Sequence, residues 1–329
     1  LAITLKDLNQ LDGAVKGYQR VIEINPNFAQ AYNNLGNLMK DLGQTDDAIK
    51  NYQKAIEINP SFAHAYNNLG NAYKDLGQPK EAVTNYQKAI EKKPEFSEAH
   101  NNLGNAYKDL GELNSALKSY QKAVEIDDNL YEAYYNLGVV LIQLNRFNEA
   151  IQCFEGAIEI NPNFAQAFNN LGSVLMSLGR LKESINYFKK SLDVDAEYVN
   201  AHNNLGIALT ELGQLKAGVK SIEKALEIDS DFAEAHNSLG NIYRRLKQRE
   251  KALLCYERAY ALKPDMDFVL GSILNTKMHL CIWNDMSSQI KDLTRRVNND
   301  EKTIDPFNQL GLIDKPSLQR KTTEIRINS

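Results

Sequence analysis

Asparagine side chains recur at a fixed interval along the chain, and they are its best candidates for binding another molecule. Asn34 is followed every 34 residues by another asparagine, until Ser238 breaks the series. We call its six members the ladder asparagines: Asn34, Asn68, Asn102, Asn136, Asn170 and Asn204. One amide can donate and accept hydrogen bonds at once, so a row of amides can hold the C=O and N–H groups of an extended peptide. The pattern therefore predicts binding of peptide main chain rather than of particular side chains.

Two alternatives to peptide binding could account for the ladder asparagines. Recent duplication of one repeat would copy an asparagine without a function, but nearby positions have diverged, to Val139 and Met176 among others, while the asparagine stays. The second alternative, a hydrogen bond to a neighbouring helix that serves stacking, stays open. Each asparagine costs roughly 0.5 kcal/mol of helix propensity relative to alanine, a repeated cost that ligand contact would explain. On a helical wheel Asn33 and Asn37 lie on the same polar side as Asn34, the side predicted to line a groove. We interpret both as replaceable polar residues of that groove.

A second candidate surface is apolar and lies in the middle of the predicted groove. Its members fall on helix positions that are polar in other repeats: Tyr135, Val139, Ile142, Met176 and Ile207. Exposed apolar groups that cluster in a concavity often mark binding sites, so these residues could contact a partner's side chain. The alternative is that they thicken the local packing.

Catalytic and metal-binding motifs are missing from the sequence. It contains no GxxxxGK[ST] loop, no GxSxG elbow, no HExxH and no GxGxxG between a strand and a helix. His100, His202 and His236 occupy a position that is aromatic in most other repeats, which indicates packing residues. His279 and Cys281 alone are too few for a structural zinc, which needs about four ligands. We expect no catalytic residue, no metal site and no cofactor.

Charge and cysteine content narrow the partners and the compartment. With 38 basic and 42 acidic residues the net charge is -4, so the chain lacks the positive field of nucleic-acid or membrane-surface binders. Three cysteines without a CxxC pair favour a reduced, cytoplasmic setting. We expect protein or peptide ligands, no nucleic acid and no membrane. A homo-oligomer stays open, because stacked repeats leave apolar edges at both ends.

The elements that carry these side chains form a repeat of 34 residues. Seven full repeats span residues 29–266, after a partial repeat at 1–28. They open at Ala29, Ala63, Ser97, Tyr131, Ala165, Val199 and Ala233. Residues 267–298 match loosely and are interpreted as a degenerate capping repeat, and residues 299–329 as a connector toward a further domain, with a short helix from about 317 to 325.

Each repeat is predicted to be a pair of helices. In the first helix, residues such as Leu35 and Leu38 fall on one apolar arc at about 100° per residue, and Gly43 ends the helix. The second helix packs through an apolar set that includes Tyr52, and the small Gly36 lets the two backbones approach closely. The fold class that follows is all-α.

With its Leu-Gly, Tyr, Gly, Ala, Tyr, Ala and Pro positions, this 34-residue spacing resembles the tetratricopeptide repeat over residues 1–266. The resemblance implies a right-handed superhelix of stacked helical hairpins, with the first helix of each hairpin lining the concave face. Physics supports an array independently, because a single hairpin cannot bury its apolar arc alone.

The ladder and the residues after the repeats resemble the O-linked N-acetylglucosamine transferase and SPINDLY group. The residues after the repeats resemble the connector of that group in these short segments: Leu270-Gly271, Thr276-Lys277-Met278, Cys281-Ile282-Trp283, Pro306-Phe307 and Asp314-Lys315-Pro316-Ser317-Leu318-Gln319. The resemblance implies a peptide-binding role for the six ladder asparagines and a glycosyltransferase domain beyond Ser329. No such domain lies in this chain, so we expect the chain itself to be non-catalytic. The alternative is a free-standing scaffold or adaptor.

Overall fold

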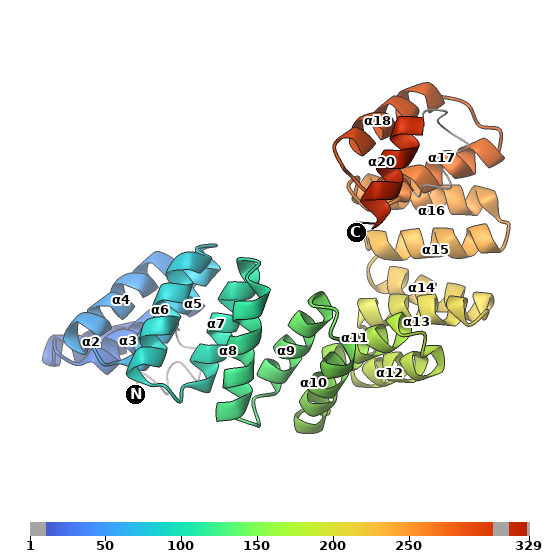
Figure 1. Cartoon of the computed structure of the whole chain (residues 1–329). Helices are drawn as coiled ribbons and strands as arrows, with labels where there is room; N and C mark the ends of the chain where they lie inside the picture. The colour runs from blue at the N-terminus through green and yellow to red at the C-terminus, as the bar shows by residue number, and fades with distance from the viewer. Residues whose placement is uncertain (1–10, 305–315, 328–329) are drawn as a thin grey trace. The chain divides into compact units, whose positions relative to one another are not determined.

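The computed structural model describes residues 11–304 and 316–327, and every regular element within them is an α-helix (Figure 1). The helices are α2 (Leu11–Ile24), α3 (Ala29–Asp41), α4 (Thr45–Ile58), α5 (Ala63–Asp75), α6 (Pro79–Lys92), α7 (Ser97–Asp109), α8 (Leu113–Ile126), α9 (Tyr131–Gln143), α10 (Phe147–Ile160), α11 (Ala165–Ser177), α12 (Leu181–Val194), α13 (Val199–Glu211), α14 (Leu215–Ile228), α15 (Ala233–Arg245), α16 (Arg249–Leu262), α17 (Val269–His279), α18 (Met286–Asn298) and α20 (Pro316–Ile327). The predicted fold class, an all-α superhelix of stacked helical hairpins, is confirmed.

The chain divides into two compact units, one up to Pro162 and one from Asn163. The first unit contains α2 to α10, and the second contains α11 to α18 with α20. Within each unit consecutive helices pair as hairpins, α3 with α4 and α11 with α12 for example, and each hairpin packs on the next. Both units therefore have the same construction and present a row of first helices.

An aromatic ring fills the space beside the recurring Leu-Gly pair in most hairpins. The buried Tyr52 of α4 lies against Gly36 of α3, where an added Cβ would come within 2.6 Å of the ring. Gly36 therefore admits the ring of Tyr52, and the expected approach of two backbones is not the main reason for this glycine. An alanine at position 36 would force the ring out of a close-packed interior.

First helices end through a left-handed residue, as the sequence predicts. At Gly43 φ is +74°, the N–H of Gly43 bonds the carbonyl of Lys40, and the N–H of Gln44 bonds that of Met39. This pair of bonds is the Schellman arrangement, which satisfies carbonyls left over at a helix end. Asn145 and Lys247 adopt the same conformation without being glycine, with φ of 58° and 59°.

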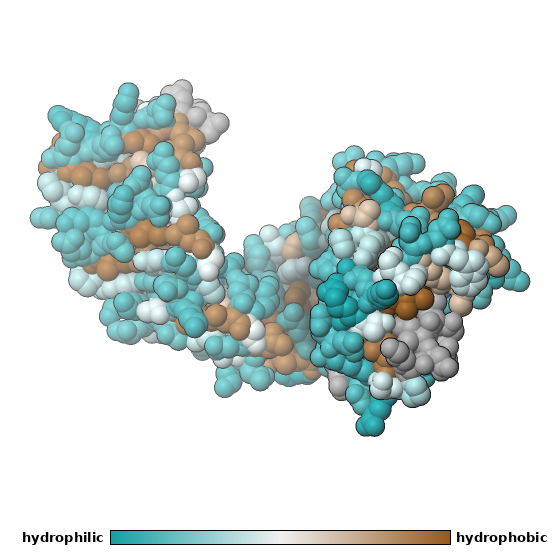
Figure 2. Space-filling view, turned by 90° about the horizontal axis from the view of Figure 1, so that it is seen from above, coloured by the Kyte–Doolittle hydropathy of each residue, from teal (hydrophilic) through white to brown (hydrophobic). Residues whose placement is uncertain are grey.

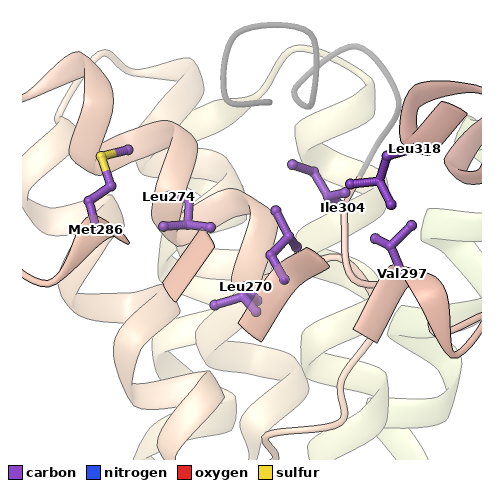
Figure 3. Packing of buried hydrophobic residues seen from close by; sticks show 7 residues of the cluster. Leu270, Leu274, Met286, Val297, Ile304 and Leu318 are labelled. Carbon is purple, nitrogen blue, oxygen red and sulfur yellow. The ribbon is translucent and has the colours of Figure 1, made fainter. Parts of the chain in front are cut away.

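The last helices of the second unit share one hydrophobic core. Leu270 and Leu274 of α17 and Leu293 of α18 are buried together with Leu318 of α20. In Figure 3 the side chain of Leu318 points toward Ile304. The amphipathic α20 thus covers an apolar surface that α17 and α18 would otherwise expose. The expected helix near 317–325 is confirmed, whereas Pro306-Phe307 and Asp314-Lys315 lie outside the described residues.

Hydrophobic side chains are mostly enclosed between helices. In the face seen in Figure 2, they form narrow bands between broader hydrophilic areas. Among the described residues, no helix combines the length and the hydrophobicity needed to cross a bilayer.

Candidate functional site

The ladder asparagines occupy equivalent places on first helices. Each is the sixth residue of its helix, in α3, α5, α7, α9, α11 and α13, and each side chain is half-buried. Four of them belong to the first unit, and Asn170 and Asn204 belong to the second. The predicted row is therefore present within each unit.

Neighbouring first helices are joined through these amides. The Nδ2 of Asn68 donates to Oδ1 of Asn33 at 3.0 Å and to Oδ1 of Asn37 at 3.0 Å. The same bond to the preceding repeat is 3.1 Å from Asn102 to Asn67 and 3.1 Å from Asn136 to Asn101. In the second unit it is 3.0 Å from Asn204 to Asn169. The stacking role that the sequence leaves open is thus real, and it accompanies any ligand contact.

Stacking does not use the whole hydrogen-bonding capacity of a ladder amide. An asparagine amide has two N–H donors and an oxygen with two lone pairs. The inter-repeat bond of Asn102 or Asn136 accounts for one donor. At the same time it fixes the plane of the amide, so the remaining groups are pre-oriented rather than free to rotate. Pre-orientation lowers the entropic cost of binding a ligand.

The residues that accept these bonds are buried, and so is Asn203 at the equivalent position of α13. We call all five the supporting asparagines: Asn33, Asn67, Asn101, Asn169 and Asn203. Asn33 is only 4% exposed. The interpretation of Asn33 as replaceable groove polarity is therefore wrong. On a single helix Asn33 lies on the polar side, but the next first helix packs over it, and a wheel for one helix cannot reveal that.

Asn37 also has a fixed partner inside its own hairpin. Its Oδ1 accepts a hydrogen bond of 2.8 Å from the hydroxyl of the buried Tyr52. Equivalent bonds join Tyr86 to Asn71 at 2.7 Å, Tyr120 to Asn105 at 2.8 Å and Tyr256 to Asn241 at 2.9 Å. Asn37 is therefore not replaceable on its own, since its loss would leave a buried hydroxyl without its acceptor.

The sequence carries a signal for this pairing. In the three repeats where the tyrosine is replaced, the asparagine is replaced as well, giving the pairs Val139 with Phe154, Ser173 with Phe188, and Ile207 with Ile222. Comparison of these two positions across the repeats would have found the contact. It also explains why Val139 and Ile207 are apolar, because their partners have no hydroxyl to satisfy.

The five apolar candidates fall into two sets. In the first unit, Val139 and Ile142 are half-buried, and the ring of Tyr135 lies 5.8 Å from that of Phe154 at a tilt of 57°. In the second unit, Met176 packs against the core that contains Phe188, and Ile207 lines a cavity of about 480 Å³. Met176 and Tyr135 thus contribute to packing. A single surface made of all five stays a prediction.

The ladder ends at a defined defect in the second unit. Ser238 stands where a ladder asparagine is expected, and its side chain is shorter than an amide. The Oδ1 of Asn203, a residue 6% exposed, has no hydrogen-bond partner among the described residues. Asn203 therefore lacks the amide donor that a ladder asparagine of the next repeat supplies to the other supporting asparagines.

In the first unit the ladder borders an open cavity. Its volume is about 300 Å³, and its lining is Asn37, Lys40, Asp41, Tyr52, Asn68 and Asn71. Lys40 forms an ion pair with Asp75 of the next repeat at 3.0 Å, which neutralises part of the charge at the edge of the cavity. The wall is thus rich in amides and carries balanced charge, a chemistry suited to peptide main chain.

The histidines and cysteines of the described residues have identifiable surroundings. No three of the histidines, cysteines and carboxylates there converge on a possible metal position. His100, His202 and His236 each place Nε2 within hydrogen-bond distance of the carbonyl six residues earlier, at 2.9 to 3.0 Å. They hold the loop between repeats. Burial raises the pKa of the thiols of Cys153 and Cys255 to about 11, which makes both poor nucleophiles.

Two sequence models of protein families match the chain. The model of the cilia and flagella-associated protein 70 C-terminal domain matches residues 3–238, and the tetratricopeptide repeat model matches residues 233–266. No curated protein sequence matches the chain at a significant level.

Solved structures of repeat proteins are similar to this chain. The APC/C hetero-tetramer Cut9–Hcn1 contains a chain with a TM-score of 0.62 and 18% identity, a likeness over 84% of the present chain and 54% of that one. YrrB, described as a TPR protein with an unusual peptide-binding site, is 29% identical over 55% of this chain and 93% of its own, with a TM-score of 0.45. MamA is 29% identical over 49% of this chain and 95% of its own, with a TM-score of 0.47.

The likeness to the Cut9–Hcn1 chain establishes the fold alone. A stacked array of this type is consistent with the binding of protein or peptide partners. Because the first family model spans more than half of the residues, the chain belongs to the family of the cilia and flagella-associated protein 70 C-terminal domain, and it is a tetratricopeptide repeat protein.

Proposed function

We propose that the first helices of each unit bind extended protein segments, and that the ladder asparagines hydrogen-bond to the main chain of the bound segment. The observation that supports this most directly is the cavity of about 300 Å³ that Asn68 lines together with Asn37 and Asn71. Its walls offer amide donors and acceptors, which pair equally well with any peptide sequence. On this proposal the chain is a binding module without a catalytic role.

The dual use of each ladder amide strengthens the proposal. The bond from Asn102 to Asn67 holds the side chain in one orientation, and the distance between equivalent ladder positions is set by stacking. A regular row of pre-oriented amides suits an extended chain, whose own donors and acceptors recur regularly. Mixed charge on the second helices, such as the pair of Lys54 with Glu57, instead suits contact with water.

Cross-linking tests where a peptide binds. Short random peptides displayed on phage are selected on the full chain, and a selected peptide is synthesised with a photoreactive group and cross-linked. We expect adducts on α5, α7 and α9, and a variant with Lys54 and Lys122 changed to Ser, on the second helices, should give the same adducts. Cross-links confined to second helices would overturn the proposal.

A finer proposal concerns the parent protein. On the resemblance of residues 270–319 to the connector of the O-linked N-acetylglucosamine transferase and SPINDLY group, we propose that the array recruits substrates for a glycosyltransferase. The matching family models and the similar structures give no support for a glycosyltransferase, so the sequence resemblance alone supports this proposal. The alternative is a free-standing scaffold or adaptor. Sequencing of the gene beyond Ser329 separates the two, since an α/β pattern of a few hundred residues favours the first and a stop codon the second.

A further inference from the structure

Two adjacent arginines distinguish α15 from the other first helices. Its residues 244 and 245 are both Arg, whereas the first three full repeats carry a Lys-Asp pair at these positions. In those repeats the two charges cancel, and the Lys of one repeat can pair with the Asp of the next, as Lys40 does with Asp75. The inner side of α15 therefore has a different charge pattern from that of α3.

Arg244 lines two adjoining cavities of the second unit. One, of about 480 Å³, is formed by Ile207, Thr210, Glu211, Asn237, Ser238, Asn241, Ile242, Arg244 and Arg245. The other, of about 500 Å³, is formed by Asn237, Asn241, Arg244, Asp267, Phe268, Ser272 and Arg326. Arg244, Asn237 and Asn241 line both cavities, so the two cavities adjoin, and we call them together the Arg244 recess.

The carboxylates of the Arg244 recess are engaged with other cations. Glu211 accepts from Arg245 at 2.8 Å, and Asp267 lies 3.9 Å from Lys302. Arg244 instead reaches neutral groups: Oδ1 of Asn241 at a long 3.5 Å, and the hydroxyl of Tyr256. Since basic groups outnumber acidic groups here, the recess favours a negatively charged guest.

The missing ladder asparagine provides the room. Ser238 forms part of the recess wall, and an amide at this position would extend toward Asn203, as Asn204 extends toward Asn169. The unpartnered, buried Oδ1 of Asn203 marks the place where that amide is absent. Ser238, which leaves room in the recess, and the two arginines thus lie on the same helix, α15.

We infer that the Arg244 recess binds an anionic side chain of a peptide ligand. Arg244 would contact two oxygens of a carboxylate or phosphate group in a bidentate manner, and the amides of Asn237 and Asn241 would donate further hydrogen bonds. The inference rests on the proposed peptide binding and adds a chemical class to it: segments with acidic or phosphorylated residues. Neutral segments rely on the ladder alone.

Fluorescence polarisation with three labelled peptides on the full chain tests this inference. The peptides share a Gly-Ser backbone and carry a central Glu-Glu, phosphoserine or Gln-Gln. We expect Glu-Glu or phosphoserine to bind about tenfold more tightly than Gln-Gln, which corresponds to about 1.4 kcal/mol. Tighter binding of Glu-Glu would identify acidic residues as the natural ligand group, and tighter binding of phosphoserine would identify phosphorylated residues. Arg244→Ala should remove this preference by weakening the binding of the two anionic peptides to about that of Gln-Gln.

Two further variants keep the test decisive. Arg249 is exposed at the start of α16 and does not line the recess, so Arg249→Ala makes the same charge change and should keep the preference. Ser238→Asn should reduce the preference by narrowing the recess. The inference is overturned if Gln-Gln binds as tightly as both anionic peptides, or if Arg244→Ala keeps the preference. Failure of the ladder proposal is distinguishable, because Gln-Gln would then not bind while an anionic peptide still could.

Discussion

The hydroxyl of Tyr52 donates a hydrogen bond of 2.8 Å to Oδ1 of Asn37, across the two helices of one hairpin. Desolvation makes the bond important, because an unpaired hydroxyl in the interior costs about 1–3 kcal/mol. Repeats that lack the tyrosine also lack the asparagine, so the chain itself supplies a compatible apolar pair, Val139 with Phe154.

Asn37→Val should lower the free energy of unfolding by about 1–3 kcal/mol, because it removes the acceptor of a buried hydroxyl. Adding Tyr52→Phe should restore most of the loss, since the pair then matches Val139 with Phe154. Hydrogen exchange of α3 and α4, followed by mass spectrometry, measures the local stability. Additive effects of the two substitutions would show that the two side chains are not coupled.

Ser238→Asn should stabilise the second unit by about 1 kcal/mol, because the new amide can donate to the buried Oδ1 of Asn203. Ser238→Ala is the matched control and should give no gain, since it adds no donor. Urea unfolding followed by circular dichroism provides the comparison. Equal stability of the Asn and Ala variants would argue against a missing donor at this position.

Buried tyrosines should make the fold sensitive to alkali. Burial raises the pKa of Tyr256 to about 12 and also raises those of Tyr52, Tyr86 and Tyr120 above the ordinary 10.0. A raised pKa favours the neutral phenol in the folded state, so its stabilising contribution is complete below pH 10.0 and is lost as the pH rises toward the folded pKa. At about pH 11 the titration of Tyr256 alone should lower the free energy of unfolding by about 1.4 kcal/mol.

Urea midpoints at neutral and alkaline pH measure this loss. The double variant Tyr256→Phe with Asn241→Val should lose part of the pH dependence, because it removes one of the buried phenols together with its acceptor. If the variant and the parent chain lose the same stability on the alkaline side, Tyr256 is not among the groups responsible.

Thiol labelling should separate the three cysteines. Cys281 is exposed, whereas burial raises the pKa of Cys153 and Cys255 to about 11. Near pH 8 only about 0.1% of a thiol with such a pKa is thiolate, the reactive form. Iodoacetamide should therefore modify Cys281 first, and in denaturant all three should react alike. Peptide mapping reads out the sites, and rapid labelling of Cys153 in the folded chain would contradict the burial.

Much of the fold could be predicted from the sequence, because the period fixes the helix pairs and Gly43 marks a helix end locally. The positions of the ladder were also predictable. The supporting role of Asn33 was not, since its partner Asn68 lies 35 residues away and meets it only when hairpins stack. The pairing of Asn37 with Tyr52 was readable in principle from their joint replacement. The Arg244 recess could not be foreseen, because α20 contributes Arg326 to it from 82 residues further along the chain.

The central claim, that ladder amides bind peptide main chain, is tested most directly by two matched triple variants. Changing Asn68, Asn102 and Asn136 to Ala removes three ladder amides with their four inter-repeat bonds, whereas changing Asn33, Asn67 and Asn101 to Ala removes three of those four bonds without touching the ladder. The measurement is the affinity of a selected peptide for both variants, by fluorescence polarisation. Three lost main-chain hydrogen bonds predict a loss of about 100-fold for the ladder variant, and a much smaller loss for its control. Equal affinities of the two variants for the peptide would contradict the account.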